Sequence, residues 1–211
     1  MLGDDLIIPG IDMGKLDVKK QLKMNSLLDT AFELFTTNGV SQTSISEISE
    51  HAGVAKGTFY LYFKDKLDIR DKLIAYKSSK LFEEAIQKLE EKNEDLPFTE
   101  SLIFITDYVI DKLTENQSLL ILISKNLGWG VFKSTLSNEL YPSDINLYEY
   151  IHRKTQDRIS QPEVMLFMIV ELVSSTCYNS IIHSEPLPIE QYKPYLYDTI
   201  RSIVRDFETG E

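Results

Sequence analysis

The residues best suited to chemistry lie in one short stretch between Lys56 and Lys66. This stretch offers ammonium groups, a threonine hydroxyl, two tyrosines and a glycine, and Asp65 is its only acid. Ammonium groups and hydroxyls bind phosphate oxygens, polar and aromatic side chains reach base edges, and a glycine allows a close backbone approach. This combination is typical of a surface that binds nucleic acid.

Other kinds of chemistry have little support in the sequence. His51, His152 and His183 are far apart, and none has a second ligand at metal-binding spacing on one helix face. There is one cysteine, Cys177, and no glycine-rich phosphate loop or Gly-x-Ser-x-Gly motif. We therefore expect no metal, no cofactor and no catalysis. An enzyme on this chain would need a cluster of perturbed titratable groups in a cleft.

The net charge at first argues against an anionic partner. The 211 residues carry 22 basic and 33 acidic side chains, and the net charge of −11 would repel DNA and anionic lipid. However, residues 1–66 contribute only −2 of this charge and residues 67–211 contribute −9. Because the acidity belongs mainly to the C-terminal part, the sequence predicts specific binding by the N-terminal part and weak nonspecific affinity for DNA.

Composition and hydropathy indicate an ordinary globular protein, with 43% hydrophobic and 26% charged residues. The longest apolar stretch, at 164–170, is far shorter than the roughly 18–20 residues that a membrane span needs. The acidic N-terminus is unlike a signal peptide, and a single cysteine suits a reducing compartment. We expect a cytoplasmic protein with no membrane partner.

Apolar residues at helical spacing predict a first helix from about residue 17, which ends at Gly39. Ser44 and Glu47 form a capping box at the start of a second helix. Gly53 supplies the positive φ of a tight turn before a third, short helix, and this spacing is that of a helix-turn-helix. The side chains expected in its core are Ile45, Ile48, Ala52, Val54, Phe59 and Phe63.

The rest of the chain also has helical patterns, with no alternating strand pattern and no internal repeat. A long helix is predicted from about residue 66 to residue 92. Further helices are predicted at about 98–115, 117–126, 129–137, 144–159, 162–184 and 189–207. We therefore predict an all-α fold with a flexible lead-in at 1–16, a helix-turn-helix domain at 17–66 and a helical body at 67–211.

The stretch from Gly39 to Lys66 resembles the N-terminal signature of the TetR family of bacterial transcriptional regulators. Its most diagnostic parts are Thr43-Ser44, Ala52-Gly53-Val54 and Lys56-Gly-Thr-Phe-Tyr-x-Tyr-Phe-Lys-x-Lys66. The resemblance covers about residues 24–73, roughly a quarter of the chain. It implies a ligand-responsive regulator of transcription, most often a repressor that a small-molecule effector releases from its operator.

The resemblance also implies roles for the matching residues. Thr43 and Ser44 would meet a phosphate at the start of the second helix, and Lys64 and Lys66 would meet phosphates beside the long helix. The residues that would line the recognition helix are Lys56, Gly57, Thr58, Tyr60 and Tyr62. Simpler interpretations stay open. Ser44 can serve only as a helix cap, Lys56 can be a solvated surface charge, and the two tyrosines can be partly buried in the core.

In that family the C-terminal body binds the effector and forms the dimer. The resemblance implies a homodimer through the last two helices, which would place two recognition helices on a palindromic double-stranded DNA operator with half-sites about 34–36 Å apart. Aromatic and polar residues of the middle helices are candidates for the ligand pocket, although such residues more often belong to a core. They are Phe104, Tyr108, Trp129, Phe132, Tyr148, Tyr178 and His183.

A second class of function stays open. The chain could be a DNA-binding or assembly module that acts through a protein partner and needs no effector. A body cavity of roughly a few hundred Å³ would favour the effector hypothesis, and a solidly packed body would favour the module. The sequence identifies neither the operator nor the effector.

Overall fold

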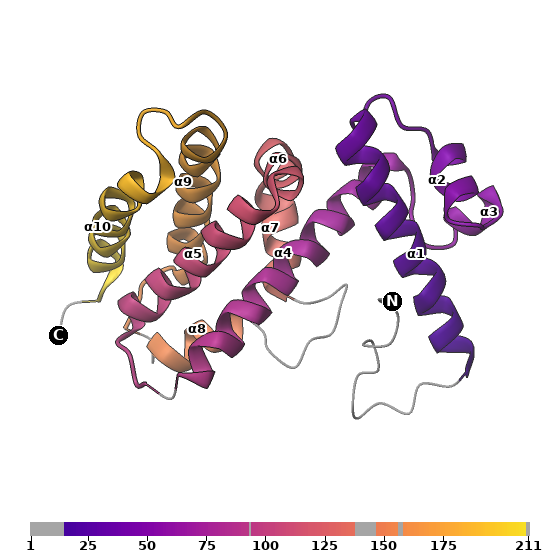
Figure 1. Ribbon diagram of the computed structural model, residues 1–211. Helices are drawn as coiled ribbons and strands as arrows, with labels where there is room; N and C mark the ends of the chain where they lie inside the picture. Colours follow the sequence, from indigo (N-terminus) through magenta and orange to yellow (C-terminus); the bar gives the residue numbers. More distant parts are fainter. Residues whose placement is uncertain (1–14, 93, 138–146, 156–157, 210–211) are drawn as a thin grey trace. The chain divides into compact units, whose positions relative to one another are not determined.

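The computed structural model describes residues 15–92, 94–137, 147–155 and 158–209. The predicted lead-in at 1–16 lies outside these ranges, except for its last two residues, which begin the first helix. The described chain is helical (Figure 1), and its one β-bridge joins Ile159 to Glu208. The all-α prediction is therefore confirmed.

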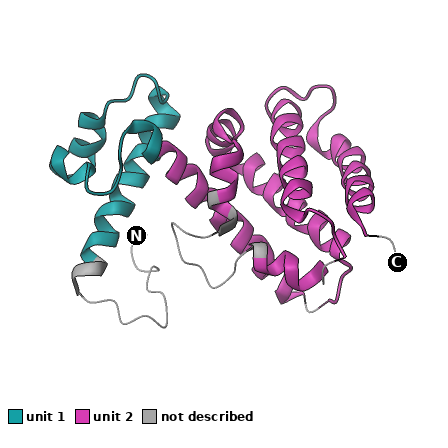
Figure 2. Ribbon diagram, turned by 180° about the vertical axis from the view of Figure 1, so that it is seen from behind, with its two compact units in different colours: residues 1–69 teal, residues 70–211 magenta. Residues whose placement is uncertain are grey.

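The helix bounds agree closely with the sequence pattern. The helices are α1 (Lys15–Asn38), α2 (Ile45–His51), α3 (Lys56–Phe59), α4 (Lys66–Glu91), α5 (Phe98–Glu115), α6 (Gln117–Asn126), α7 (Trp129–Ser137), α8 (Leu147–Thr155), α9 (Pro162–His183) and α10 (Ile189–Phe207). They form two compact units, residues 1–69 and residues 70–211 (Figure 2).

Unit 1 contains α1, α2, α3 and the start of α4. Gly39 and Gly53 have φ angles of +84° and +67°, which a residue with a Cβ atom adopts only under strain. They end α1 and turn the chain between α2 and α3, as predicted. The capping box is present, because Glu47 N–H donates to Ser44 Oγ (3.2 Å) and Ser44 N–H donates to the Glu47 carboxylate (2.7 Å).

The core of unit 1 is apolar and largely aromatic on the α3 side. Phe59 and Phe63 are 0% and 1% exposed, and their ring centroids are 5.5 Å apart. They were predicted to be core, and this prediction is confirmed. The other fully or nearly buried side chains of the unit include Leu27, Leu28, Ala31, Phe35, Ile48 and Ile69. This packing fixes which side of α3 faces outward.

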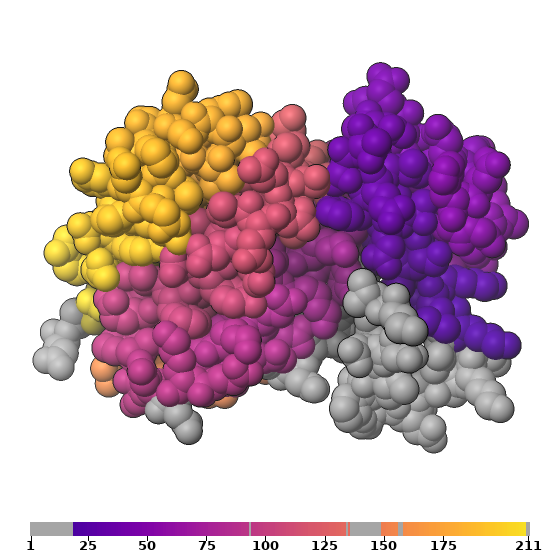
Figure 3. Space-filling model, in the orientation of Figure 1, coloured from indigo at the N-terminus to yellow at the C-terminus, as the bar shows by residue number. Residues whose placement is uncertain are grey.

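Unit 2 is built around α9, which packs against α5, α6 and α10. Figure 3 shows α9 and α10 side by side on one surface of the unit, in orange and yellow. Pro162 starts α9 at a position where its missing N–H costs no hydrogen bond. The inner residues of the unit form one cluster, which includes Ile86, Ile105, Ile110, Met165, Ile169, Leu196 and Ile200.

The helix α9 is more apolar than the sequence stretch at 164–170 suggested. By length and composition alone this 22-residue helix could cross a membrane, although its longest uninterrupted apolar stretch is the one at 164–170. Met165, Leu166 and Ile169 are buried in the core cluster, so packing within unit 2 accounts for part of this apolar character. Val164 and Met168 stay 44% and 47% exposed.

One predicted helix is longer than the observed one. The sequence predicted a helix at 144–159; the described part of that range contains α8 (Leu147–Thr155), and residues 144–146 and 156–157 lie outside the described ranges. Ile159 is in the bridge with Glu208, and Ser160 N–H donates to the carbonyl of Phe207 (2.8 Å). These pairings with the end of α10 replace helical hydrogen bonds, which a local pattern does not reveal.

Candidate functional site

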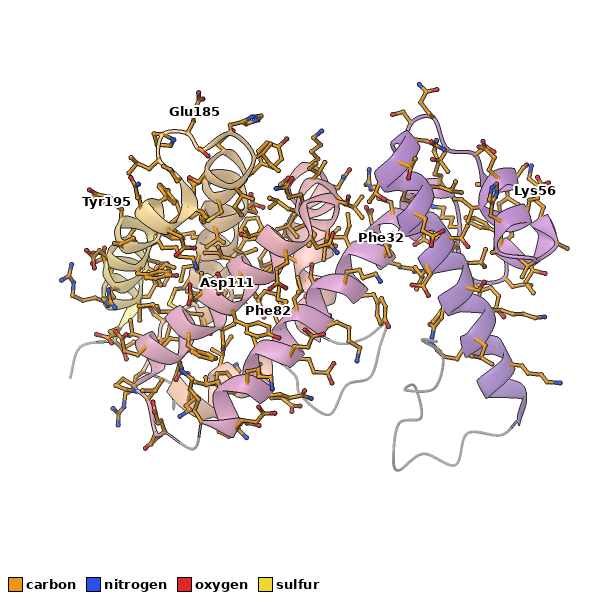
Figure 4. All side chains as sticks on the ribbon, in the orientation of Figure 1. Phe32, Lys56, Phe82, Asp111, Glu185 and Tyr195 are labelled. Carbon is orange, nitrogen blue, oxygen red and sulfur yellow. The ribbon has the colours of Figure 1, made fainter. Side chains whose placement is uncertain are left out.

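Residues 56–64, which we call the α3 segment, comprise α3 and the turn that follows it. This segment presents an exposed surface opposite the buried rings of Phe59 and Phe63. Lys56 stands at its N-terminal end, at the edge of unit 1 (Figure 4). Tyr60 is 53% exposed. A Cβ atom added at Gly57 would meet no atom within 4 Å, so the protein's own packing does not demand a glycine there. An outside group that comes close to the backbone would demand one.

The other predicted residues of this segment are less open. Thr58 and Tyr62 are half-buried, and the ring of Tyr62 lies 6.3 Å from that of Phe63. The α3 helix ends at Phe59, so Tyr60 and Tyr62 lie on the turn that follows it. Lys64 is exposed, and its backbone N–H donates to the Asp68 carboxylate (2.7 Å).

Thr43 does not have the surface position that phosphate binding requires. Its side chain is 1% exposed, and its hydroxyl donates to the carbonyl oxygens of Gly39 (2.9 Å) and Leu34 (3.3 Å). The hydroxyl thus holds the turn after α1. The resemblance assigned Thr43 to a phosphate contact, and the structure corrects this to a role within the fold.

Ser44 and Lys66 combine an internal role with partial exposure. Ser44 caps α2, and its hydrogen bonds hold the pKa of the exposed Glu47 carboxyl below its usual value. The Lys66 ammonium donates to the carbonyl oxygens of Ser41 (3.0 Å) and Thr43 (2.8 Å). An ammonium group has three donors, so a further bond to a phosphate is compatible with these two.

A cavity of about 80 Å³ lies inside unit 2, between helices α4, α5, α6, α7 and α9. Phe82 of α4 is directed towards α5 (Figure 4) and forms part of its wall. None of the described residues that line the wall is charged. The lining residues besides Phe82 are Ser78, Leu81, Leu102, Ile105, Thr106, Val109, Leu113, Ile123, Leu127, Phe132, Thr135, Leu166, Ile169, Val170, Val173 and Ser174.

The polar atoms of the cavity's lining side chains are hydroxyl groups. Most of these hydroxyls already donate a hydrogen bond within the protein. Three of the four hydroxyls donate to carbonyl oxygens of their own helices. The pairs are Thr106 with Leu102 (2.8 Å), Thr135 with Val131 (3.0 Å) and Ser174 with Glu171 (3.2 Å). The wall therefore offers a ligand mainly apolar surface.

Few of the predicted ligand residues lie at this cavity. Among the described residues, Phe132 is the one predicted residue that lines it. Trp129 packs nearby, with its ring 6.0 Å from Phe132 and 5.1 Å from Phe167. Tyr108 is placed elsewhere, its hydroxyl 3.4 Å from the Glu84 carboxylate.

The remaining predictions lie further from the cavity wall. Phe104 lies under the ammonium of Lys92, 4.3 Å from the ring centroid, and Tyr178 contacts His183 near the end of α9, with ring centroids 6.0 Å apart. The side chain of Tyr148 lies outside the described part. The cavity is lined mainly by leucine, isoleucine and valine, which are core formers in any sequence, so no local signal could have found it.

A second, open groove of about 920 Å³ lies at α8 and the end of α10. Its lysine and arginine side chains are largely paired, Arg153 with Glu90 (3.2 Å) and Lys154 with Asp95 (3.1 Å). Tyr150 lines the groove, and its buried hydroxyl has no hydrogen-bond partner in the described part of the chain. The groove mixes charges of both signs, so it has neither an apolar nor an anion-binding character.

A charged cluster joins α5 to α10. The Lys193 ammonium, 10% exposed, lies 2.6 Å from Asp111, 2.9 Å from Asp107 and 3.2 Å from Glu190. The hydroxyl of Tyr197 donates to Asp107. Burial alone would lower the pKa of Lys193, but the hydrogen bonds from Lys193 to these carboxylates outweigh burial and raise it. The cluster thus holds α10 against α5.

Comparison with known proteins adds the following similarities. Residues 27–73 match the family model described as bacterial regulatory proteins, tetR family. A 74-residue stretch is 39% identical to the fatty acid metabolism regulator protein of Bacillus subtilis and covers 35% of this chain. The matched region spans only 38% of that relative's length.

Solved structures of similar fold extend over most of the chain. The fatty acid degradation regulator FadR of Bacillus halodurans superposes with a TM-score of 0.57 at 20% identity and covers 90% of this chain and 96% of its own. Thermus thermophilus FadR, a TetR-family repressor solved in complex with lauroyl-CoA, has a TM-score of 0.57 at 18% identity, with 89% and 96% covered. At these identities the likeness concerns the fold.

Proposed function

Residues 27–73 match the TetR family model of bacterial regulatory proteins, and from that match we propose that the chain is a ligand-responsive transcriptional regulator. In its most common form such a regulator is a repressor that an effector releases from its operator. The observation that carries the proposal is the exposed α3 segment inside the matched region, with Lys56, Gly57 and Tyr60 outward. As a soluble DNA-binding protein it would act in the cytoplasm.

We propose that the α3 segment enters the major groove of double-stranded DNA. Tyr60 is an exposed predicted contact, and Gly57 lets the backbone approach. Lys56 and Lys64 supply charge for phosphates. The other proposed contacts are Ser44, Thr58, Tyr62 and Lys66, the last of which also holds the loop before α2.

We propose that the chain acts as a homodimer through α9 and α10. Val164 and Met168 leave apolar surface exposed on α9, and Tyr195, 66% exposed, stands on the outer side of α10 (Figure 4). Burial of such side chains against a second copy removes apolar area from water. Two copies would present two recognition segments to the half-sites of a palindromic operator.

The cavity in unit 2 is the proposed effector site. The open groove is the weaker candidate, because carboxylates already hold two of its cations. The cavity wall fits an apolar ligand, and a structural neighbour was solved with lauroyl-CoA. Its volume of about 80 Å³ is below the roughly 300–1,000 Å³ of drug-sized sites, so a ligand must select a wider state of the body.

The same small volume favours the second candidate function. A body that stays closed would fit an effector-independent DNA-binding or assembly module that acts through a protein partner. The two candidates differ in one measurable property, which is whether an apolar ligand changes the affinity for DNA.

The DNA-binding proposal can be tested with the purified full chain and a randomised duplex pool. We expect selection of a palindromic sequence, and we expect Tyr60→Ala to weaken binding to it by about 1–3 kcal/mol if Tyr60 reads a base. Ile121→Ala, on an exposed position of α6, is the control. Failure to enrich any sequence would refute the proposal.

The effector proposal can be tested on the selected duplex with lauroyl-CoA as the probe. We expect release of the duplex as lauroyl-CoA is added, and no release by coenzyme A alone, because only the acyl chain suits the apolar wall. Unchanged DNA affinity across a series of acyl chain lengths would instead support the effector-independent module.

A further inference from the structure

Leu61 is an apolar side chain on the open surface of unit 1. It is 76% exposed, more than any other large hydrophobic side chain in the described ranges. A single exposed leucine is ordinary on a protein surface. Leu61, however, follows Tyr60 directly, in the middle of the segment proposed to enter the major groove. At that position its side chain would meet whatever the segment binds.

The local backbone places Leu61 on the outward side of this segment. Leu61 N–H donates to the carbonyl of Thr58 (3.2 Å) and Phe63 N–H donates to that of Phe59 (3.0 Å), so the turn continues the helical direction of α3. Residues 60 and 61 lie three and four positions after residue 57, and residue 64 lies four and three positions after them, which are helical steps. They therefore share one side, and Phe59 and Phe63 occupy the other.

The charges around Leu61 complement a polyanion. Lys56 and Lys64 flank the segment and are exposed. The nearest acids along the chain bond to backbone at or just before the start of α4, where Asp65 accepts from the N–H of Leu67 (2.8 Å) and Asp68 accepts from that of Lys64 (2.7 Å). An apolar side chain between lysines, with these acids bonded to backbone, fits DNA better than an acidic or neutral protein surface.

A leucine side chain has no donor or acceptor, so it cannot read the hydrogen-bonding edge of a base. The apolar group that distinguishes one base pair from another in the major groove is the C5-methyl of thymine. We infer that Leu61 contacts a thymine methyl and so selects thymine at one position of each half-site. This inference rests on the proposed DNA-binding function and adds to it a specificity-determining residue.

The test removes the methyl group and nothing else. The duplex selected by the full chain is prepared with each thymine in turn replaced by deoxyuridine, and binding is measured for the wild type and for Leu61→Ala. We expect the wild type to lose about fourfold in affinity at one position of each half-site, the value of about one buried methyl group. Leu61→Ala should bind the thymine and uracil duplexes equally at that position.

Two control variants show whether the sensitivity to uracil belongs to Leu61 itself. Leu67→Ala, 52% exposed in the same unit, should keep the wild-type sensitivity to uracil. Leu61→Met, which keeps an apolar side chain, should retain part of it. If no duplex is selected at all, the proposed function itself fails.

Two outcomes would overturn the inference while leaving DNA binding in place. One is a loss of affinity in Leu61→Ala that is the same for thymine and uracil at every position, which would indicate a sugar or backbone contact. The other is a change in oligomeric state with no effect on uracil sensitivity, which would indicate a contact with a second copy or another protein.

Discussion

The ammonium of Lys66 donates a hydrogen bond to the carbonyl oxygen of Thr43 over 2.8 Å. The first residue of α4 thereby holds the loop that leads into α2, and it also donates to Ser41 (3.0 Å). The sequence resemblance assigns both Lys66 and Thr43 to phosphate binding. In the structure the two residues are joined to each other, so the lysine orients the start of α2 even without DNA.

This relationship distinguishes two lysines that the sequence treats alike. We expect Lys66→Met to lower the free energy of unfolding by about 1–2 kcal/mol, because two charge-assisted hydrogen bonds are lost at a partly exposed site. Lys64→Met should leave stability almost unchanged. Urea unfolding followed by circular dichroism measures both values.

The same pair of variants can be compared on DNA. Lys64→Met should reduce the slope of log affinity against log salt concentration by about 1, as the loss of one phosphate contact does. Equal stability of the two lysine variants would contradict the structural role of Lys66. An unchanged salt slope in Lys64→Met would contradict its phosphate contact.

Gly53 and Gly57 should respond differently to the same substitution. Gly53 has a φ of +67°, so Gly53→Ala should destabilise unit 1 by about 1–2 kcal/mol. Gly57 lies in α3 with open space at its Cβ position, so Gly57→Ala should keep or slightly raise stability. We expect it to weaken DNA binding, because the added methyl group stands between backbone and DNA.

Thermal unfolding and duplex titration of the two alanine variants check this prediction. A Gly57→Ala protein that binds the selected duplex as tightly as the wild type would show that the backbone does not approach DNA at this residue.

The fold was largely predictable because its signals are local. Gly39 and Gly53 indicate positive φ angles, and Ser44 with Glu47 indicates a helix cap. Pro162 indicates a helix start. Each of these signals depends only on residues that are close in the sequence. The bridge that takes Ile159 out of the predicted helix was not predictable, since it pairs Ile159 with Glu208 across about fifty residues of chain.

The candidate site was predictable only in part. Lys56 and Tyr60 were proposed as DNA contacts because their types match a known motif, and the structure leaves both exposed. Thr43 was assigned to the surface by the same motif, but its hydroxyl faces inward, which a motif does not encode. Leu61 was missed because an aliphatic residue carries no chemical signal until its exposure is known.

The charged cluster between α5 and α10 makes stability depend on pH. Burial raises the pKa of Asp107, but hydrogen bonds from Tyr197 and Lys193 outweigh burial and hold the pKa below its usual value. The ionised carboxylate therefore stabilises the fold above about pH 4, the range of an unfolded aspartate, and this contribution is lost as pH falls through the lower folded pKa.

We therefore expect the stability gap between the wild type and Asp107→Asn to narrow as pH falls below about 4. Tyr197→Phe removes one of the two hydrogen-bond donors to Asp107. Its stability difference from the wild type should be smaller and should also narrow as pH falls. Urea unfolding at a series of pH values measures these gaps. A gap that stays constant down to low pH would show that the hydrogen bonds do not stabilise the ionised form.

Filling the cavity should separate the effector response from DNA binding. Val170 lines the wall from α9, and Val170→Phe adds a ring to a space of about 80 Å³. We expect this variant to bind the selected duplex like the wild type and to ignore lauroyl-CoA, because the space that the acyl chain needs is occupied. Ile121→Phe, on the exposed side of α6, is the control, and fluorescence anisotropy of labelled duplex is the measurement. A filled variant that still responds would place the effector elsewhere.

The hydroxyls of Thr106, Thr135 and Ser174 are all turned back into their own helices. Ser78 supplies the one remaining hydroxyl among the described lining residues, so such a wall discriminates ligands mainly by the length and width of their apolar chain, each methylene group changing the affinity by roughly 0.8 kcal/mol. Transcription under such a sensor would rise in steps along a homologous series. The level of transcription would then depend on the concentration and length of apolar chains in the cell, whichever compound carries them.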